Sequence, residues 1–254
     1  AHVATGNVQN VFVGNEAGIG NTTGVTNTFI GGSAGAANTT AANNVAVGTN
    51  SLGAVTTGAD NVALGSAAGD LLTTGIRNII IGSRADASAV GAQQQIVMGY
   101  DVDGNADSSF CFGSQGTDSA IAFGATSITA PSDVRLKEDI QDEEVGLGFI
   151  NDLRPVTFQW KKEKDIPEEM KAHVAGSEKR TMNGKHNHGF IAQEVKAVID
   201  NHNMKDGFDM WTEDDSDGRQ RLGDASLMPI MVKAVQELST ALDAALARIT
   251  TLEG

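Results

Sequence analysis

The 254-residue chain is poor in the features that cross-link a protein or carry it across a membrane. Cys111 is the single cysteine, so the chain cannot form an intrachain disulfide or bind zinc through a cysteine cluster. Its apolar runs are all far shorter than the ~18 residues that cross a bilayer. The N-terminal AHVATGNVQN lacks the basic start and apolar core of a signal peptide. We therefore expect no membrane insertion.

Basic residues are also scarce, with 18 Lys and Arg against 32 Asp and Glu and a formal net charge of −14. Proteins that bind nucleic acid neutralise phosphates with Lys and Arg, so we expect no nucleic-acid partner. Metal-ligand clusters and cofactor motifs are not evident either, and we expect neither a metal nor a cofactor. What the chain has in excess is glycine, 30 residues in all, unevenly distributed.

The first half of the chain is built from a repeat of Asn, three mostly apolar residues and Gly. Five copies follow one another at intervals of 17 residues: NVFVG at Asn10, NTFIG at Asn27, NVAVG at Asn44, NVALG at Asn61 and NIIIG at Asn78. QIVMG at Gln95 keeps the interval, and two degraded copies, SFCFG at Ser109 and AIAFG at Ala120, follow at shorter spacing. Such a period predicts a parallel β-solenoid in which each unit buries its strand against its neighbours.

Each unit has a mechanical interpretation. The apolar run predicts a short strand, and the glycine after it suits a bend with positive φ. A small residue occurs seven positions after each Asn: Ala17, Ala34, Ser51, Ala68 and Ala85. We expect each Asn to hydrogen-bond the turn or stack in a ladder, with glycan binding as the alternative. Asp60, Asp70 and Asp86 occupy different phases of the repeat and are not expected to form a row.

About three core residues per unit is little for one narrow solenoid, since small cores compete poorly with chain entropy. We therefore predict an all-β repeat fibre over residues 1–127, a trimeric β-roll or β-prism solenoid whose three chains share one core. The units resemble the head repeats of trimeric autotransporter adhesins and the shafts of phage tail fibres. A monomeric β-solenoid is the alternative. Glycine-rich disorder is disfavoured because the apolar positions are too regular.

Residues 128–254 have a different composition and predict an α+β domain. We expect a helix near 145–153, a strand in PVTFQW, a flexible charged excursion over 161–188, and a hairpin followed by a strand or turn over 208–227. HGFIAQEVKAVIDNH predicts an amphipathic helix. Its apolar face carries Ile191, Val195, Val198 and Ile199.

Residues 226–254 predict a coiled-coil helix. Apolar residues follow steps of three and four without interruption: Met228, Met231, Val235, Leu238, Leu242, Ala245, Ile249 and Leu252. This a/d pattern favours one helix of a trimeric coiled coil, with Ser226 as N-cap. The alternative is a core helix packed on its own domain.

The stretch APSDVRLKEDI lies where the composition changes. Pro131 and the Ser-Asp that follows predict a turn, which could bring Ser132 close to Lys137. A neutral lysine can act as the base that turns a serine into a nucleophile. The alternation of apolar and basic residues also predicts a short strand with Arg135 and Lys137 on one face, where the charge of Arg135 would favour the neutral amine.

Three motifs together are similar to a known family: SDVRLKEDI, GFIAQEV at 189–195 and LMPIMVKAVQEL at 227–238. They resemble the self-cleaving intramolecular chaperone domain at the C-terminus of phage tail spikes and tail fibres, of the endosialidase type. The resemblance covers residues 130–254, about half the chain. It implies a domain that trimerises, guides the folding of the preceding fibre and then cuts itself off once, without turnover on other substrates.

The resemblance also implies residue roles. Ser132 would be the nucleophile and Lys137 its base. Pro131 and Asp133 flank the cut, which falls on one side of Ser132 or the other, and Asp133 would position the turn or the scissile peptide. Arg135, Gln193 and Glu194 belong to the supporting motifs.

These features predict the end of a homotrimeric tail fibre of a virion, with the mature fibre binding a glycan or protein receptor on the host surface. A bacterial cell-surface trimeric adhesin with the same chaperone is the alternative. A polysaccharide-degrading tailspike is disfavoured because few acidic or aromatic residues line the repeat. A transcription factor, by analogy with the related myelin regulatory factors, is excluded because a basic DNA-binding segment is lacking.

Overall fold

The computed structural model describes residues 9–204, 208–214 and 216–253. The chain divides between Glu138 and Asp139 into two compact units, which we call the solenoid unit and the C-terminal unit. The sequence-based boundary lies earlier, after residue 127, because the composition changes before the chain leaves the first unit.

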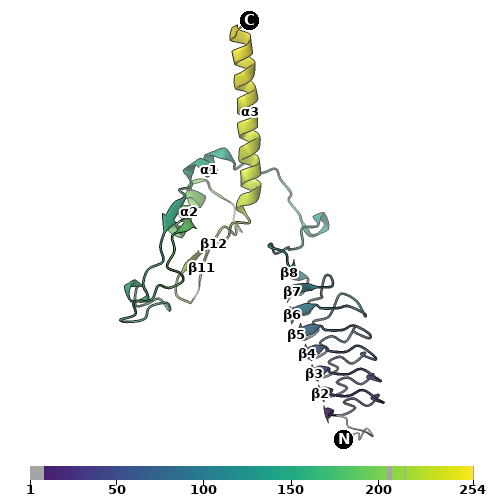
Figure 1. Ribbon diagram of the computed structural model, residues 1–254. Helices are drawn as coiled ribbons and strands as arrows, with labels where there is room; N and C mark the ends of the chain where they lie inside the picture. The colour runs from purple at the N-terminus through teal and green to yellow at the C-terminus, as the bar shows by residue number, and fades with distance from the viewer. Residues whose placement is uncertain (1–8, 205–207, 215, 254) are drawn as a thin grey trace. The chain divides into compact units, whose positions relative to one another are not determined.

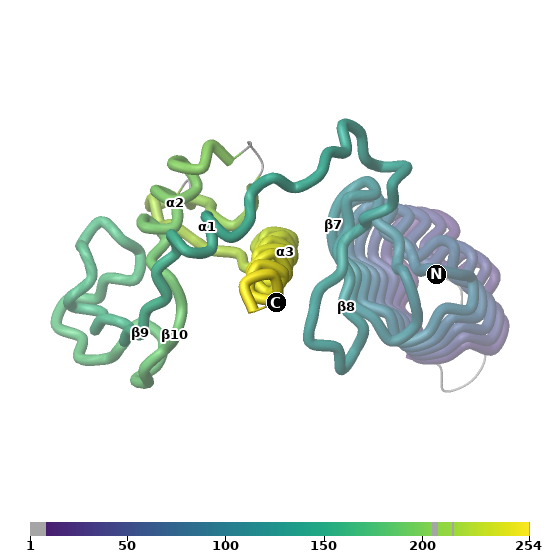
Figure 2. The backbone as a smooth tube through the Cα atoms, turned by 90° about the horizontal axis from the view of Figure 1, so that it is seen from above, coloured from purple at the N-terminus to yellow at the C-terminus, as the bar shows by residue number. Residues whose placement is uncertain are grey.

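The solenoid unit is one sheet of short strands stacked in sequence order (Figures 1 and 2). Its strands are β1 (Val11–Val13), β2 (Thr28–Ile30), β3 (Val45–Val47), β4 (Val62–Leu64), β5 (Ile79–Ile81), β6 (Ile96–Tyr100), β7 (Ser109–Ser114) and β8 (Thr117–Ala122). Neighbours from β1 to β7 are parallel, and β8 closes the stack antiparallel to β7. Val11 pairs with Thr28 and Thr28 with Val45, so the register equals the 17-residue period. The predicted solenoid is confirmed.

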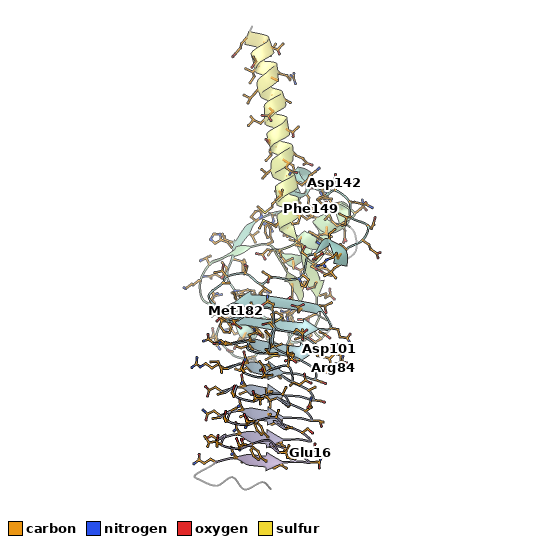
Figure 3. The ribbon with its side chains drawn as sticks, turned by 90° about the vertical axis from the view of Figure 1, so that its right-hand side faces the viewer. Glu16, Arg84, Asp101, Asp142, Phe149 and Met182 are labelled. Carbon is orange, nitrogen blue, oxygen red and sulfur yellow. The ribbon has the colours of Figure 1, made fainter. Side chains whose placement is uncertain are left out.

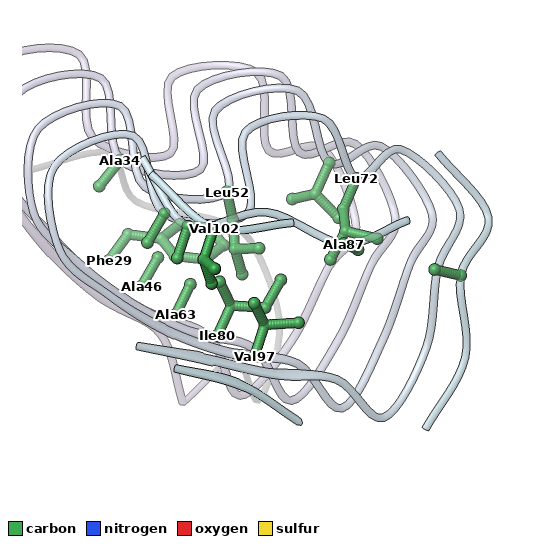
Figure 4. Close-up of a cluster of buried hydrophobic side chains, with 14 of the residues drawn as sticks. Phe29, Ala34, Ala46, Leu52, Ala63, Leu72, Ile80, Ala87, Val97 and Val102 are labelled. Carbon is green, nitrogen blue, oxygen red and sulfur yellow. The ribbon is translucent and has the colours of Figure 1, made fainter. Parts of the chain in front are cut away.

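A column of side chains fills the interior of the coil. The second residue of each strand from β2 to β6 is buried: Phe29, Ala46, Ala63, Ile80 and Val97 (Figure 4). The small residues predicted at the second corner are buried beside them, and Leu52, Val55 and Leu72 complete the cluster. Each chain therefore has a core of its own. The first and third residues of each strand point away from this core.

The glycine after each strand is required by close approach of successive turns. Gly48 has φ +138°, and a Cβ placed on it would lie 2.3 Å from the carbonyl oxygen of Gly65. An L-residue is strained at this φ and would collide with backbone that cannot move aside. The sequence motif ends in Gly for this reason.

The motif asparagines form a buried ladder. The Oδ1 of Asn61 accepts hydrogen bonds from the backbone N–H and the Nδ2 of Asn78, both at 3.0 Å. Its own Nδ2 donates to the carbonyl of Gly75 at 2.9 Å. Asn27, Asn44 and Gln95 occupy the same position in other turns and are buried too. The structural interpretation is confirmed, and side chains buried in this way cannot contact a glycan.

Over its described residues, the C-terminal unit combines three α-helices and one 3-10 helix with two small two-stranded sheets. Its elements are α1 (Leu147–Asp152), β9 (Val156–Phe158), the 3-10 helix η2 (Glu163–Asp165), β10 (Asn187–Gly189), α2 (Ala192–Asn201), β11 (Trp211–Glu213), β12 (Gln220–Leu222) and α3 (Leu227–Glu253). β9 pairs with β10 and β11 with β12, both antiparallel. The predicted helices, the strand in PVTFQW and the hairpin are confirmed.

Its core gathers residues that are distant in the sequence. Phe149 of α1, Val195 and Ile199 of α2, and Ile230 of α3 are buried in one cluster with Met210 (Phe149 is labelled in Figure 3). Val198 packs against the edge of this cluster, whereas Ile191 precedes the first turn of α2 and is exposed. The predicted apolar face of α2 is thus correct in its main residues.

Helix α3 attaches to its own unit through one face. Ile230 and Ala234 are buried, and the Glu237 carboxylate accepts a hydrogen bond of 2.8 Å from the backbone N–H of Leu147 at the start of α1. The neighbouring heptad face remains exposed along its whole length: Met228, Met231, Val235, Leu238, Leu242, Ala245, Ile249 and Leu252. Within the described residues, α3 is not apolar enough to cross a membrane, nor is any other helix.

Candidate active site

Ser132 and Lys137 meet in the structure. The Lys137 Nζ donates a hydrogen bond to the Ser132 Oγ across 2.7 Å, and both side chains are exposed. Between them lies η1 (Val134–Leu136), a single turn of 3-10 helix whose three residues are also exposed. The predicted juxtaposition is present, and it arises within the solenoid unit from residues close in sequence.

Asp133 caps this turn. Its backbone is extended, and its Oδ1 accepts a hydrogen bond of 2.9 Å from the backbone N–H of Arg135. Its carbonyl accepts from the N–H of Leu136 at 3.0 Å, and Lys137 closes the turn by donating to the carbonyl of Val134 at 3.2 Å. The turn predicted from Pro131 and Ser-Asp is correct. The strand predicted for residues 134–137 is wrong, because an Asp at an N-cap favours a helical turn over an extended chain.

Arg135 is bound to Asp133. Its Nε donates to Oδ1 at 3.0 Å and its Nη2 to Oδ2 at 2.6 Å. Hydrogen bonds from Arg135 hold the pKa of the Asp133 carboxyl below its ordinary value, so the carboxyl is ionised at neutral pH. The guanidinium is therefore engaged with Asp133 and is not displayed beside Lys137 on a strand, as the sequence had suggested.

The Ser132–Lys137 pair has the chemistry of a nucleophile and its base. A neutral amine at 2.7 Å can accept the proton of the hydroxyl as the oxygen attacks a carbonyl carbon. A charged ammonium at the same distance can only donate. Burial away from water is the usual way a protein favours the neutral form of a lysine.

Gln193 and Glu194 lie in the first turn of α2, in the C-terminal unit. The Glu194 carboxylate forms a two-point ion pair with Arg154, at 2.9 Å from Nε and 2.5 Å from Nη2. Negative charge is also favoured at a helix N-terminus. Glu194 thus fixes the start of α2 against the segment before β9. Sequence reasoning placed it in the motif but did not identify Arg154, which lies 40 residues earlier.

Two of the solenoid carboxylates influence each other, although the acids form no row, as expected. The pKa of Asp86 is raised to about 7, mainly by burial and further by the neighbouring Asp70 carboxyl. The sequence hid this pair because its members are 16 rather than 17 residues apart. Both Asp86 oxygens already accept backbone N–H groups, from Ala87 and Leu71, so the carboxyl is tied into the corner of the coil.

The comparisons with known proteins agree with these features. The model of the family described as Chaperone of endosialidase (Peptidase_S74) matches residues 132–204, beginning at Ser132 itself. Searches of curated proteins and of solved structures found no match. The predicted resemblance is confirmed over this range, and a β-solenoid precedes it. The match supports an intramolecular chaperone of the tail-fibre type in this part of the chain.

Proposed function

We propose that the chain is the end of a trimeric fibre whose C-terminal part assembles three copies and then releases itself by one cut next to Ser132. The observation that carries this proposal is the 2.7 Å contact of Lys137 with Ser132 at the first residue of the family match. The released fibre would serve attachment of a virion to a glycan or protein receptor on its host.

The cut uses only groups of the chain and water. Neutral Lys137 takes the proton of the Ser132 hydroxyl, and the oxygen bonds to the adjacent carbonyl carbon. The peptide C–N bond then breaks, and the Lys137 ammonium gives its proton to the departing amine. Water hydrolyses the resulting ester and restores the serine. The reaction runs once per chain because each chain carries one such bond beside Ser132.

The exposed heptad face of α3 supports assembly. Its residues are all apolar, and Val235 and Leu238 are 63% and 51% exposed. A different face of α3, with Ile230, Ala234 and Glu237, attaches the helix to the rest of its own unit. The heptad face is therefore not needed for that attachment. An uninterrupted a/d face left open in this way is typical of a coiled coil whose other helices belong to further copies.

The outer face of the solenoid sheet supports assembly independently. Two columns of side chains point away from the coil, one from the first and one from the third residue of each strand. They are apolar apart from Thr28 and carry no charge from β1 to β6: Val11, Thr28, Val45, Val62, Ile79 and Ile96, and Val13, Ile30, Val47, Leu64, Ile81 and Met98. Identical copies repeat this spacing and can pack on it turn for turn.

A fibre of this kind needs help to assemble. The chains must find a common register before the exposed columns are buried, and the open faces meanwhile invite aggregation. Helices form quickly from local contacts and raise the effective concentration of the attached solenoids. Removal of the chaperone then leaves a fibre that persists through slow unfolding.

Denaturing gels of the expressed chain test the proposal. We expect fragments of about 131 and 123 residues, whose masses identify the bond that is cut. Ser132→Ala and Lys137→Ala should leave the chain whole, whereas the matched controls Ser127→Ala and Lys161→Ala should cleave as the wild type does. A wild-type chain that is folded and trimeric but intact would contradict self-cleavage, and a monomeric mass in solution would contradict the assembly.

A bacterial surface adhesin is the second candidate, because the solenoid repeat resembles adhesin heads as well as phage shafts. The genomic sequence N-terminal to this chain distinguishes the two. A virion-attachment domain supports the fibre, and a secretion signal or membrane anchor supports the adhesin.

A further inference from the structure

The inference concerns Asp133 and Arg135, and it rests on the proposed self-cleavage. Neither residue touches Ser132 or Lys137 through its side chain among the contacts of the turn, yet both lie between them. Three hydrogen bonds join the pair: Arg135 N to Oδ1 at 2.9 Å, Nε to Oδ1 at 3.0 Å and Nη2 to Oδ2 at 2.6 Å.

The turn that carries the reacting groups has little else to hold it. The residues of η1 are exposed, and a single 3-10 turn is not stable on its own backbone hydrogen bonds. An ion pair in such an exposed place adds little to global stability. Its two-point geometry can nevertheless select one conformation of the short loop that contains it.

That conformation decides whether the reacting atoms meet. Ser132 precedes the capping residue, and Lys137 follows the turn with an extended backbone at φ −123° and ψ 142°. If the turn opens, the two residues follow an extended chain and their side chains separate by several ångströms. Closing the turn therefore brings Lys137 Nζ to Ser132 Oγ.

We propose that Arg135 is a positioning residue for self-cleavage, acting through Asp133 to hold the closed turn that aligns Lys137 with Ser132. This differs from an effect of the Arg135 charge on Lys137. In the positioning mechanism the planar, two-point guanidinium matters, whereas in the charge mechanism any cation at position 135 suffices.

The test is the first-order rate constant of self-cleavage as a function of pH, measured on the full chain after rapid refolding. We expect Arg135→Ala to lower the rate constant at least tenfold at every pH, since a displacement of about 1 Å can cost a hundredfold, with the midpoint of the pH profile unchanged. Arg135→Lys, which keeps the charge but not the fork, should be nearly as slow.

Arg84→Ala is the matched control. Arg84 binds Asp101 with the same two-point geometry, from Nε to Oδ1 at 2.9 Å and from Nη2 to Oδ2 at 2.6 Å. These two residues lie on adjacent turns of the solenoid and are labelled in Figure 3. We expect it to cleave at the wild-type rate. The final cleaved fraction separates misfolding from slow chemistry, because a chain that fails to fold lowers the amplitude and not the rate constant.

Two outcomes would overturn the inference. The first is cleavage of Arg135→Ala at the wild-type rate. The second is full activity of Arg135→Lys together with an Arg135→Ala chain whose pH midpoint moves upward and whose rate recovers at high pH, as expected if only the charge of Arg135 matters. Either leaves the proposed function intact. A wild-type chain that never cleaves, by contrast, would defeat the proposed function itself.

Discussion

The two units of this chain bury their apolar residues in opposite ways. In the solenoid unit every turn contributes the same few residues to a column, and the buried polar groups repeat with it, so contacts join positions 17 residues apart. In the C-terminal unit, α1, α2 and α3 bring Phe149, Val195 and Ile230 together once. The repeating unit gains stability turn by turn from its neighbours, whereas the C-terminal unit folds as a single cluster.

The difference extends to charge. Of the 18 Lys and Arg residues, only Arg77 and Arg84 precede Ser132, and the first lysine in the chain is Lys137. A cut at Ser132 would leave a fibre with two sites for trypsin-like proteases and place all remaining sites in the released part. The proposed fibre and its proposed assembly aid therefore differ in composition as well as in fold.

The sharpest test of the comparison is the same substitution, glycine to alanine, in each unit. Gly48→Ala should destabilise the solenoid by at least ~3 kcal/mol, because the added Cβ lies 2.3 Å from backbone and φ is +138°. Gly189→Ala in β10 should change the C-terminal unit by less than ~1 kcal/mol, since its Cβ would meet only the Phe158 ring at 3.5 Å.

Both effects can be followed in one sample of the uncleavable Ser132→Ala chain. Trp160 and Trp211 are the two tryptophans and lie in the C-terminal unit, so their fluorescence reports on that unit, while far-UV circular dichroism includes the solenoid strands. Denaturant unfolding with both signals separates the transitions. A Gly48→Ala chain with an unaltered strand signal would show that successive turns need not approach as closely as described.

A smaller effect is expected from breaking the asparagine ladder. Asn61→Ala leaves the backbone N–H of Asn78 and the carbonyl of Gly75 without their partners inside the coil, at a cost of about 2–3 kcal/mol. The matched change Asn187→Ala removes only local hydrogen bonds to Asn183 and Lys185 at the surface and should cost less than ~0.5 kcal/mol. Equal shifts of the two unfolding transitions would contradict a special role for the ladder.

The sequence predicted best what depends on local periodicity. The register of the solenoid, the small corner residues and the heptad face of α3 all follow from spacings of 17 or of three and four. The approach of Lys137 to Ser132 was also predictable, because the chemistry of a turn is local. The strand assigned to residues 134–137 failed for a local reason as well, since capping by Asp133 outweighs the alternation of apolar and basic residues.

Contacts between distant residues could not be predicted. Glu194 forms an ion pair with Arg154, which lies 40 residues away in the sequence. Glu237 accepts a hydrogen bond from the backbone N–H of Leu147, which lies 90 residues away. Their spacing carries no periodic signal, and many other carboxylates in the chain could have filled the same roles. The influence of Asp70 on Asp86 was missed for another reason. The two residues are 16 rather than 17 positions apart, so the 17-residue period does not align them.

That carboxyl pair gives the smallest and most specific expected effect, a pH dependence confined to the solenoid. Because the folded-state pKa of Asp86 is raised to about 7, the folded chain holds a proton that the unfolded chain releases near pH 4. The stability that this proton contributes is fully present below about pH 4 and is lost as pH rises through 7. Allowing for partial solvent exposure, the loss is about 1–2 kcal/mol.

Asp86→Asn should remove this pH dependence. Between pH 5 and pH 8 the solenoid of the variant should become increasingly stable relative to that of the wild type, while the unfolding transition followed by tryptophan fluorescence is unaffected. Asp101→Asn is the matched control. Arg84 lowers the pKa of Asp101, so any stability from that exposed pair is lost only as pH falls below about 4. Between pH 5 and pH 8 the midpoints of Asp101→Asn should therefore follow those of the wild type. Unfolding midpoints at pH 5, 6, 7 and 8 decide the matter. If the unfolding midpoints of the wild type and of Asp86→Asn change in parallel over this range, the folded chain does not hold a proton on Asp86 near neutral pH. The solenoid unit then lacks the pH response proposed to distinguish it from the C-terminal unit.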